Sequence, residues 1–209
     1  GFGNFNDNLL EQLADQGNGW YAYVDSIEEA ERIFVDDLVG SLQTVADDAK
    51  VQVEFDQRNV ATYRLIGFEN RDIADTDFRN DLVDAGEIGA GHTVTALYEV
   101  DLQRGVRPGD GEEIATVTLR WTEPGARAAD EVAGRITTDV LHDDVRDASS
   151  HYRLTASAAT FAEILRGSRH VRSVDVRDIL DLAEDAASEI NTAESWDLVE
   201  LIEAVEQML

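Results

Sequence analysis

Asp84–Leu102, DAGEIGAGHTVTALYEVDL, is the stretch that decides how the centre of this chain folds. Gly86 and Gly91 have the spacing of a phosphate-binding loop, and Thr93 follows at the position of the magnesium-ligating hydroxyl. His92, however, occupies the position of the lysine. A phosphate loop also joins a buried strand to a helix, whereas here an acidic run precedes the glycines and a strand-like run follows them. The stretch therefore predicts a glycine turn that leads into a strand, and not a nucleotide site.

The charge balance is strongly acidic, with 44 Asp and Glu against 17 Lys and Arg and a formal net charge of −27. Lys50 is the only lysine. Because such a surface repels phosphate backbones and anionic membranes, we expect neither nucleic acid nor a membrane as partner. The composition is also typical of proteins from salt-rich surroundings, where screening removes self-repulsion. The alternative explanation for the lack of lysine is a GC-rich genome, which favours Arg over Lys.

The 209 residues, 43% of them apolar, suffice for a packed core. The chain has no cysteine, which excludes disulfides, thiolate metal sites and cysteine nucleophiles. No run approaches the ~20 apolar residues of a membrane span. The composition therefore predicts a globular chain that does not insert into a membrane.

The first stretch reads as helix, strand, helix. Asn6 or Asp7 caps a first helix, which ends at Gly17–Gly19. Trp20–Val24 is a short aromatic strand. A Ser-x-x-Glu capping box then opens a second amphipathic helix, over residues 26–45.

The middle of the chain alternates apolar and polar residues, which predicts an antiparallel sheet or sandwich. The strands are expected at Val51–Phe55, Thr62–Ile66, Thr93–Leu102 and Ile114–Trp121, with one more at Gly134–Leu141. The turn-rich Arg104–Gly111 is predicted to connect its two flanking strands as a hairpin. From about Asp147 the period changes to 3.6 and predicts three short helices, with apolar stripes at residues 154–165, 174–183 and 196–205.

Four segments carry a family resemblance. Gly1–Leu42, which contains GFGNFNDNLLEQLADQGNGWYAYVDSIEEAERIF, resembles the closing helix, strand and helix of a von Willebrand factor type A domain. Three later segments resemble the domain of uncharacterised function that follows it in a family of bacterial von Willebrand-type proteins. They are Tyr63–Arg71 (YRLIGFENR), Asp84–Val100 and Phe161–Gly167 (FAEILRG).

The resemblance implies an α+β chain in three parts. Residues 1–46 would be the truncated α/β tail of a von Willebrand-type domain, 47–146 an antiparallel, sandwich-like β domain, and 147–209 a helical cap. It also implies an extracytoplasmic protein, secreted or lipid-anchored at the bacterial surface, that recognises other proteins.

Domains of this type bind partners through Mg²⁺ held by an Asp-x-Ser-x-Ser loop, and a partner carboxylate completes the octahedral shell. The chain lacks that loop, because after Asp147, Ser149 and Ser150 the second serine position holds His151. We therefore assign no metal, cofactor or catalytic residue here, and expect Mg²⁺ only at an adhesion site upstream.

Isolated candidate residues have simple alternatives. His92 could serve as a base or a metal ligand, but beginning a strand after the glycine turn explains it better. His142 with Asp143 and Asp144 is ligand-like, yet three adjacent side chains cannot all point to one ion. The remaining histidines lack an i+4 histidine and are expected on the surface: His151 and His170.

The acidic loop at residues 72–81 resembles a calcium loop, but Arg79 falls at a ligand position and there is no central glycine. The asparagines at positions 4, 6 and 8 fail in the same way. The three tryptophans are interpreted as core or interface anchors: Trp20, Trp121 and Trp196.

Three functions remain open. The leading hypothesis is a non-enzymatic, adhesion-type module that binds a protein partner and could dimerise through exposed strand edges. The first alternative is a hydrolase or carbohydrate-active domain that uses carboxylates near His92 or in the acidic loops. The second is a structural scaffold that presents the upstream domain.

Overall fold

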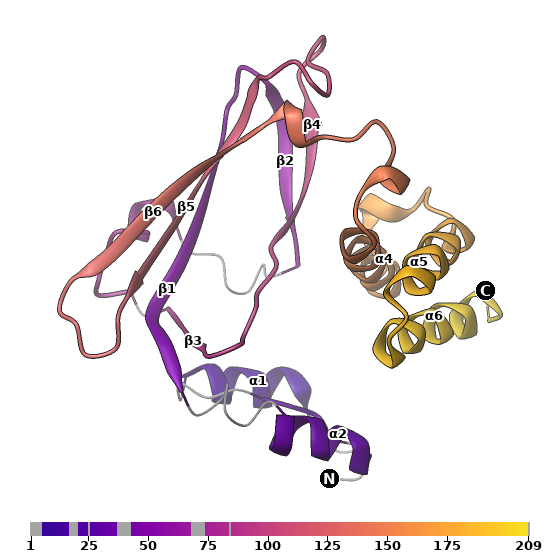
Figure 1. Cartoon of the computed structure of the whole chain (residues 1–209), viewed down its shortest axis with the longest axis horizontal. Coiled ribbons are helices and arrows are strands. Elements are labelled where there is room, and N and C mark those ends of the chain that lie inside the picture. Colours follow the sequence, from indigo (N-terminus) through magenta and orange to yellow (C-terminus); the bar gives the residue numbers. More distant parts are fainter. Residues whose placement is uncertain are drawn as a thin grey trace. The chain divides into compact units, whose positions relative to one another are not determined.

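The computed structural model of this chain describes residues 6–16, 21–24, 26–36, 43–67, 74–83 and 85–208. The fold is α+β, with two antiparallel sheets followed by three C-terminal helices (Figure 1). The chain divides into two compact units. The first holds the N-terminal helices and the four-stranded sheet; the second holds the two-stranded sheet and the C-terminal helices. The division at residues 46 and 146 stays a prediction.

The sheet of the first unit has the strand order β3-β1-β5-β6. Its strands are β1 (Thr44–Phe55), β3 (Gly86–Gly89), β5 (Glu113–Thr122) and β6 (Ala129–Thr137). β1 and β5 run antiparallel, with Val51 opposite Leu119 and Lys50 opposite Arg120. The register shifts between residues 47 and 50 at a bulge, where Asp48 has a φ of 51°.

This register separates a polar face from an apolar face, because side chains alternate along a strand. The polar face carries Lys50, Gln52, Thr118 and Arg120. Residues 74–83, which include the short helix η2 (Asp75–Asp77), lie over it. Lys50 donates to the carbonyls of Asn80 and Val83, and Phe78 is buried. The polar face is therefore the covered one, with Lys50 6% exposed.

The second unit contains the ribbon of β2 (Val60–Ile66) and β4 (Leu97–Leu102), paired antiparallel from Val60 opposite Leu102 to Ile66 opposite Leu97. An isolated two-stranded ribbon is marginally stable and needs packing against another element. Arg64 of β2 supplies such a link, because its Nη1 lies 3.1 Å from Oε2 of Glu163 on the first C-terminal helix.

The C-terminal helices are α4 (Ser150–Leu165), α5 (Val176–Ile190) and α6 (Ala193–Glu206). Each starts at a side-chain cap, since Ser149, Asp175 and Thr192 accept hydrogen bonds from backbone N–H groups of the first turn. Their apolar sides meet in one core. This helical core consists of Phe161, Val176, Ile179, Ala183, Ala187, Val199 and Ile202.

The N-terminal segment agrees only in part with expectation. Asn6 caps α1 (Asp7–Gln16), as its Oδ1 accepts a hydrogen bond from the Leu9 N–H at 3.2 Å. The strand predicted at Trp20–Val24 is wrong over residues 21–24, which are irregular. The second helix is shorter than predicted, with α2 (Ile27–Glu31) continuing as the π-helical turn η1 (Arg32–Asp36). Residues 44 and 45 already belong to β1. Gly17–Gly19 and Trp20 lie outside the described residues.

In the middle region, the predicted positions of the strands agree with the structure better than their predicted pairing does. β4 starts only at Leu97, and residues 92–96 are irregular. The predicted hairpin across Arg104–Gly111 is wrong, since β4 pairs with β2 and β5 pairs with β1. β6 starts at Ala129 and ends at Thr137, where the 3₁₀ turn η3 (Thr138–Val140) takes over.

Candidate functional site

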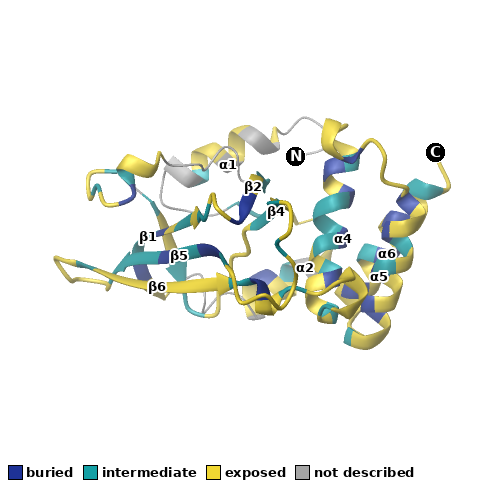
Figure 2. Cartoon of the chain, turned by 90° about the horizontal axis from the view of Figure 1, so that it is seen from above, coloured by how far each residue is buried: buried dark blue, intermediate teal, exposed yellow. Residues whose placement is uncertain are grey.

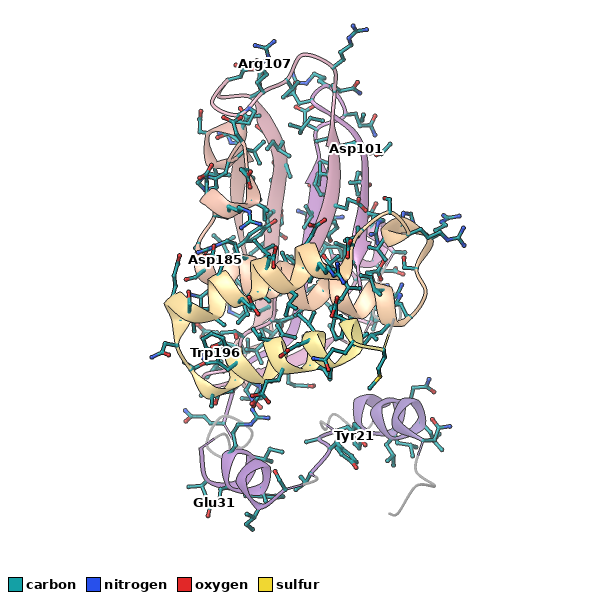
Figure 3. The ribbon with its side chains drawn as sticks, turned by 90° about the vertical axis from the view of Figure 1, so that its right-hand side faces the viewer. Tyr21, Glu31, Asp101, Arg107, Asp185 and Trp196 are labelled. Carbon is teal, nitrogen blue, oxygen red and sulfur yellow. The ribbon has the colours of Figure 1, made fainter. Side chains whose placement is uncertain are left out.

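A shallow, open depression on the helical unit is the strongest candidate site. Its residues come from α5, from α6 and from the short helix η4 (Val145–Asp147). Figure 3 shows Asp185 on α5 and Trp196 on the neighbouring α6 at the same end of the two helices. The lining residues are Arg146, Asp181, Glu184, Asp185, Ser188 and Trp196. We call this feature the α5–α6 depression.

Helical spacing explains why these side chains meet. The four α5 residues are separated by three, one and three positions, which places them on one face of the helix. Asn191, in the left-handed conformation with a φ of 54°, ends α5 and allows the chain to reverse after two residues into α6. Trp196, in the first turn of α6, is thereby brought beside the last turns of α5.

A buried arginine fixes one carboxylate of the depression. Arg153 of α4 is 3% exposed, and its Nη1 donates to Oδ2 of Asp185 at 2.5 Å. Its Nη2 lies 2.7 Å from Oε1 of Glu189. The hydrogen bond to Glu189, the largest contribution, raises the pKa of the Arg153 guanidinium. Asp185 is therefore held in the depression in a fixed orientation, as a hydrogen-bond acceptor.

The depression favours a positively charged group. Three carboxylates face a single guanidinium, that of Arg146. Trp196 is 39% exposed, which leaves part of its ring available to a cation or to a planar group. Among the described residues, no group of three or more acidic or histidine side chains is arranged to hold a metal ion. The arrangement thus suits a larger organic cation, such as a guanidinium or an ammonium, better than a bare metal ion.

The glycine stretch has a different backbone geometry from a phosphate loop. Gly86–Gly89 is strand β3, and the His92 N–H donates to the Gly89 carbonyl at 3.1 Å to close the turn. An irregular segment follows in place of the helix that a phosphate loop requires. His92 itself is exposed and precedes β4 by several residues, which corrects its predicted place in that strand.

The other candidate residues are dispersed. His142, Asp143 and Asp144 are exposed, and Asp144 uses Oδ1 to cap η4 by accepting from the Arg146 N–H at 2.9 Å. His151 and His170 are exposed, as predicted.

The acidic loop does not converge on a cation site. Asp75 Oδ1 accepts from Gln52 at 3.4 Å, Asp77 Oδ1 accepts from Asn80 at 3.3 Å, and Asp81 forms an ion pair with Arg120. Asp72 and Asn4 lie outside the described residues, as does the side chain of Asn8.

Sequence reasoning missed the α5–α6 depression. Trp196 was assigned to the apolar stripe of α6, but it is partly exposed, while Val199 and Ile202 fill the core. In a chain with 44 acidic residues, the acidic face of α5 does not stand out. The depression could have been predicted from two features taken together: polar residues at i, i+3, i+4 and i+7 on one face of α5, and a tryptophan that follows after a short turn.

Comparison with known proteins identifies relatives without a described activity. Residues 40–208 match the family model described as the C-terminal region of the uncharacterized protein YfbK. The uncharacterized protein YfbK of Escherichia coli (strain K12) is 30% identical over 218 residues, which cover 97% of this chain and 37% of that protein. No solved structure matches. The part of the chain that the structure describes contains no helix long and apolar enough to cross a membrane. Since the family model covers most of its residues, the chain belongs to the family of YfbK C-terminal domains.

Proposed function

We propose that this chain is a non-enzymatic protein-interaction module whose α5–α6 depression receives a basic side chain of a protein partner. The observation that carries the proposal is the placement of the partly exposed Trp196 ring beside the carboxylates of Asp181, Glu184 and Asp185. Carboxylates hold a guanidinium through charge-assisted hydrogen bonds, and an aromatic face adds a cation–π contact.

The openness of the depression supports binding over catalysis. Paired-carboxylate hydrolysis needs one carboxyl that stays protonated near neutral pH, usually through burial in an apolar pocket. The Asp185 side chain is instead half exposed, and its carboxylate is bound to the Arg153 guanidinium. This pairing supports recognition of a cation rather than proton transfer.

The place of the module in a longer protein is also a proposal. Residues 1–39 precede the segment that matches the family model, and their sequence resembles the end of a von Willebrand factor type A domain. The chain spans little more than a third of the length of the E. coli relative. We infer an extracytoplasmic, surface-attached bacterial protein in which Mg²⁺-dependent adhesion belongs to an upstream domain and basic-side-chain recognition belongs to this one.

An NMR titration tests the proposal with a short peptide that carries one central arginine, and with the same peptide carrying citrulline as the matched control. Citrulline keeps the shape of the side chain but loses its charge. We expect saturable shifts of the Trp196 indole N–H with the arginine peptide and at least a tenfold weaker response with citrulline (about 1.4 kcal/mol). Equal responses, or no saturable response, would contradict the proposal.

A pair of double variants locates the binding site. Asp181→Asn with Glu184→Gln removes two charges from the depression, and Glu200→Gln with Glu203→Gln removes two charges from α6 outside its lining. The first variant should lose the arginine-dependent shifts and the second should keep them. Equally weakened peptide binding in both variants would show that the peptide is attracted only by the overall negative charge of the chain.

A further inference from the structure

We infer that strand β6 is a self-association edge, at which β6 of a second copy pairs antiparallel and joins two four-stranded sheets into one. β6 is the last strand of its sheet and has a sheet neighbour, β5, on one side. Residues 130–136 are all exposed, and Figure 2 shows the strand in the exposed colour along most of its length. This inference does not rest on the α5–α6 depression.

β6 has little of the protection that edge strands usually carry. Exposed edges are commonly kept short, interrupted by proline or a bulge, or lined with charged side chains. β6 is nine residues long and contains no proline, and its charged residues are of both signs, so that a second copy can pair with them: Asp130, Glu131 and Arg135. Its backbone is therefore available as a template for another strand.

The sequence of β6 is complementary to itself. A two-fold axis at Ala133 places Glu131 of one copy opposite Arg135 of the second, and the symmetry repeats the pair. Opposite charges at facing positions of an antiparallel pair are stabilising. The same register places Val132 opposite Gly134, where an added Cβ would meet nothing within 4 Å in a single copy. The edge therefore favours a second copy of itself over an arbitrary strand.

In the joined sheet, the polar faces of the two copies would lie on one side and their apolar faces on the other. Glu131 lies on the covered polar face, because Arg79 of the 74–83 segment donates from Nη2 to its Oε1 at 2.6 Å. By alternation Val132 and Ile136 lie on the opposite, apolar face, which β1 and β5 continue. The apolar residues of these two strands are Val51, Val53, Val117, Leu119 and Trp121.

That apolar face is incompletely covered in a single copy. Val51 is 58% exposed, Val132 54% and Ile136 38%. In this register Val132 of one copy lies diagonally from Val132 and Ile136 of the second copy, while Ile136 faces Asp130, so pairing at β6 would chiefly reduce the exposure of Val132. Contiguous exposed apolar surface of this kind commonly marks an association site.

Charge repulsion sets the conditions for association. Each copy carries −27, so pairing is opposed at low salt. Raising NaCl from about 0.1 M to about 1 M shortens the screening length from ~10 Å to ~3 Å and should strengthen the dimer. The Glu131–Arg135 pairs lose some attraction over the same range, but they are few against the total charge.

Sedimentation equilibrium of the chain, over a range of concentrations at both salt levels, tests the inference. We expect a monomer–dimer equilibrium that shifts toward dimer at high salt. Arg135→Glu places like charges at both symmetric contacts and should raise the dimer dissociation constant about tenfold. Arg127→Glu, in the loop before β6, makes the same change in net charge and should have a much smaller effect.

The charge-swapped variant Glu131→Arg with Arg135→Glu, made together with Arg79→Glu so that residue 131 keeps an oppositely charged neighbour in its own chain, recreates the facing opposite charges and should recover most of the lost association. A monomer under all conditions would overturn the inference. So would a dimer that Arg135→Glu and Arg127→Glu weaken equally, because its interface would then lie elsewhere. Circular dichroism of each variant confirms that the sheet is retained.

Discussion

The ammonium group of Lys50 lies 2.6 Å from the carbonyl oxygen of Val83. It also donates to the carbonyl of Asn80 at 2.9 Å, so that the only lysine of the chain fastens the 74–83 segment to the sheet. The side chain is nearly buried, and both of its acceptors are backbone carbonyls of that one segment.

Replacing Lys50 by methionine keeps the length of the side chain and removes the donor. We expect the free energy of unfolding to fall by about 1 to 3 kcal/mol, the usual cost of an unsatisfied buried polar group. Urea denaturation measures this directly. The matched control is Arg127→Met, an exposed position, which should stay within about 0.5 kcal/mol of the wild type. Equal stability of Lys50→Met and the control would contradict the role of Lys50.

Glu163 links the two-stranded ribbon to the helical core. Its side chain is 3% exposed, and its carboxylate contacts Arg64 Nη1 at 3.1 Å and Arg166 Nε at 3.0 Å. Glu163→Gln keeps the shape but removes the charge and should destabilise the chain by about 2 kcal/mol. Glu200→Gln, on an exposed face of α6, controls for the loss of one negative charge.

A double-mutant cycle with Arg64→Met separates the pair from other effects. If Glu163 acts through Arg64, Glu163→Gln should cost less in the Arg64→Met background, since neighbouring charges in one network do not contribute additively. Additive effects would indicate that Glu163 acts through Arg166 or through packing alone.

Local patterns predicted the elements better than their partners. The 3.6 period of α4, α5 and α6 and the alternation of β1, β2 and β5 depend on nearby residues, and the structure confirms them. Whether β4 pairs with β2 or with β5 depends on contacts distant in sequence, and alternation looks the same in both cases. Turn residues at 104–111 suggested a hairpin because glycines favour many kinds of connection.

The candidate site shows the same limit. An acidic face on α5 and a tryptophan on α6 have separate, ordinary explanations in the sequence. They form a depression because the turn at Asn191 reverses the chain and Arg153 of α4 orients Asp185. That geometry involves three helices, and periodicity describes one helix at a time.

Asn191 itself offers a test of backbone strain. Its φ of 54° lies in the left-handed region, which asparagine and glycine tolerate and β-branched residues do not. Asn191→Gly should therefore leave the stability unchanged or slightly higher, while Asn191→Val should lower it by about 1 to 2 kcal/mol. Thermal unfolding of the two variants, compared with Asn191→Ala as an intermediate case, checks this order. A valine variant as stable as the glycine variant would contradict it.

The pair of Arg79 and Glu131 predicts a specific dependence on pH. The hydrogen bond from Arg79 is the main reason that the pKa of Glu131 lies below its ordinary value of 4.5. A carboxyl whose pKa is lower in the folded state stabilises the fold above its unfolded pKa, and this stabilisation is lost as the pH falls through the folded pKa. Wild type should thus be more stable than Glu131→Gln near pH 6, and the difference should shrink as the pH falls below 4.5 and through the lowered pKa of Glu131, because its carboxyl then becomes uncharged like the glutamine side chain.

Denaturant unfolding of both proteins across this pH range measures how the difference changes. In an Arg79→Gln background the same substitution should lose most of its pH dependence, because the donor that lowers the pKa of Glu131 is gone. A difference between wild type and Glu131→Gln that stays constant from about pH 6 to about pH 3 would show that Glu131 acts on the sheet through shape rather than through its charge.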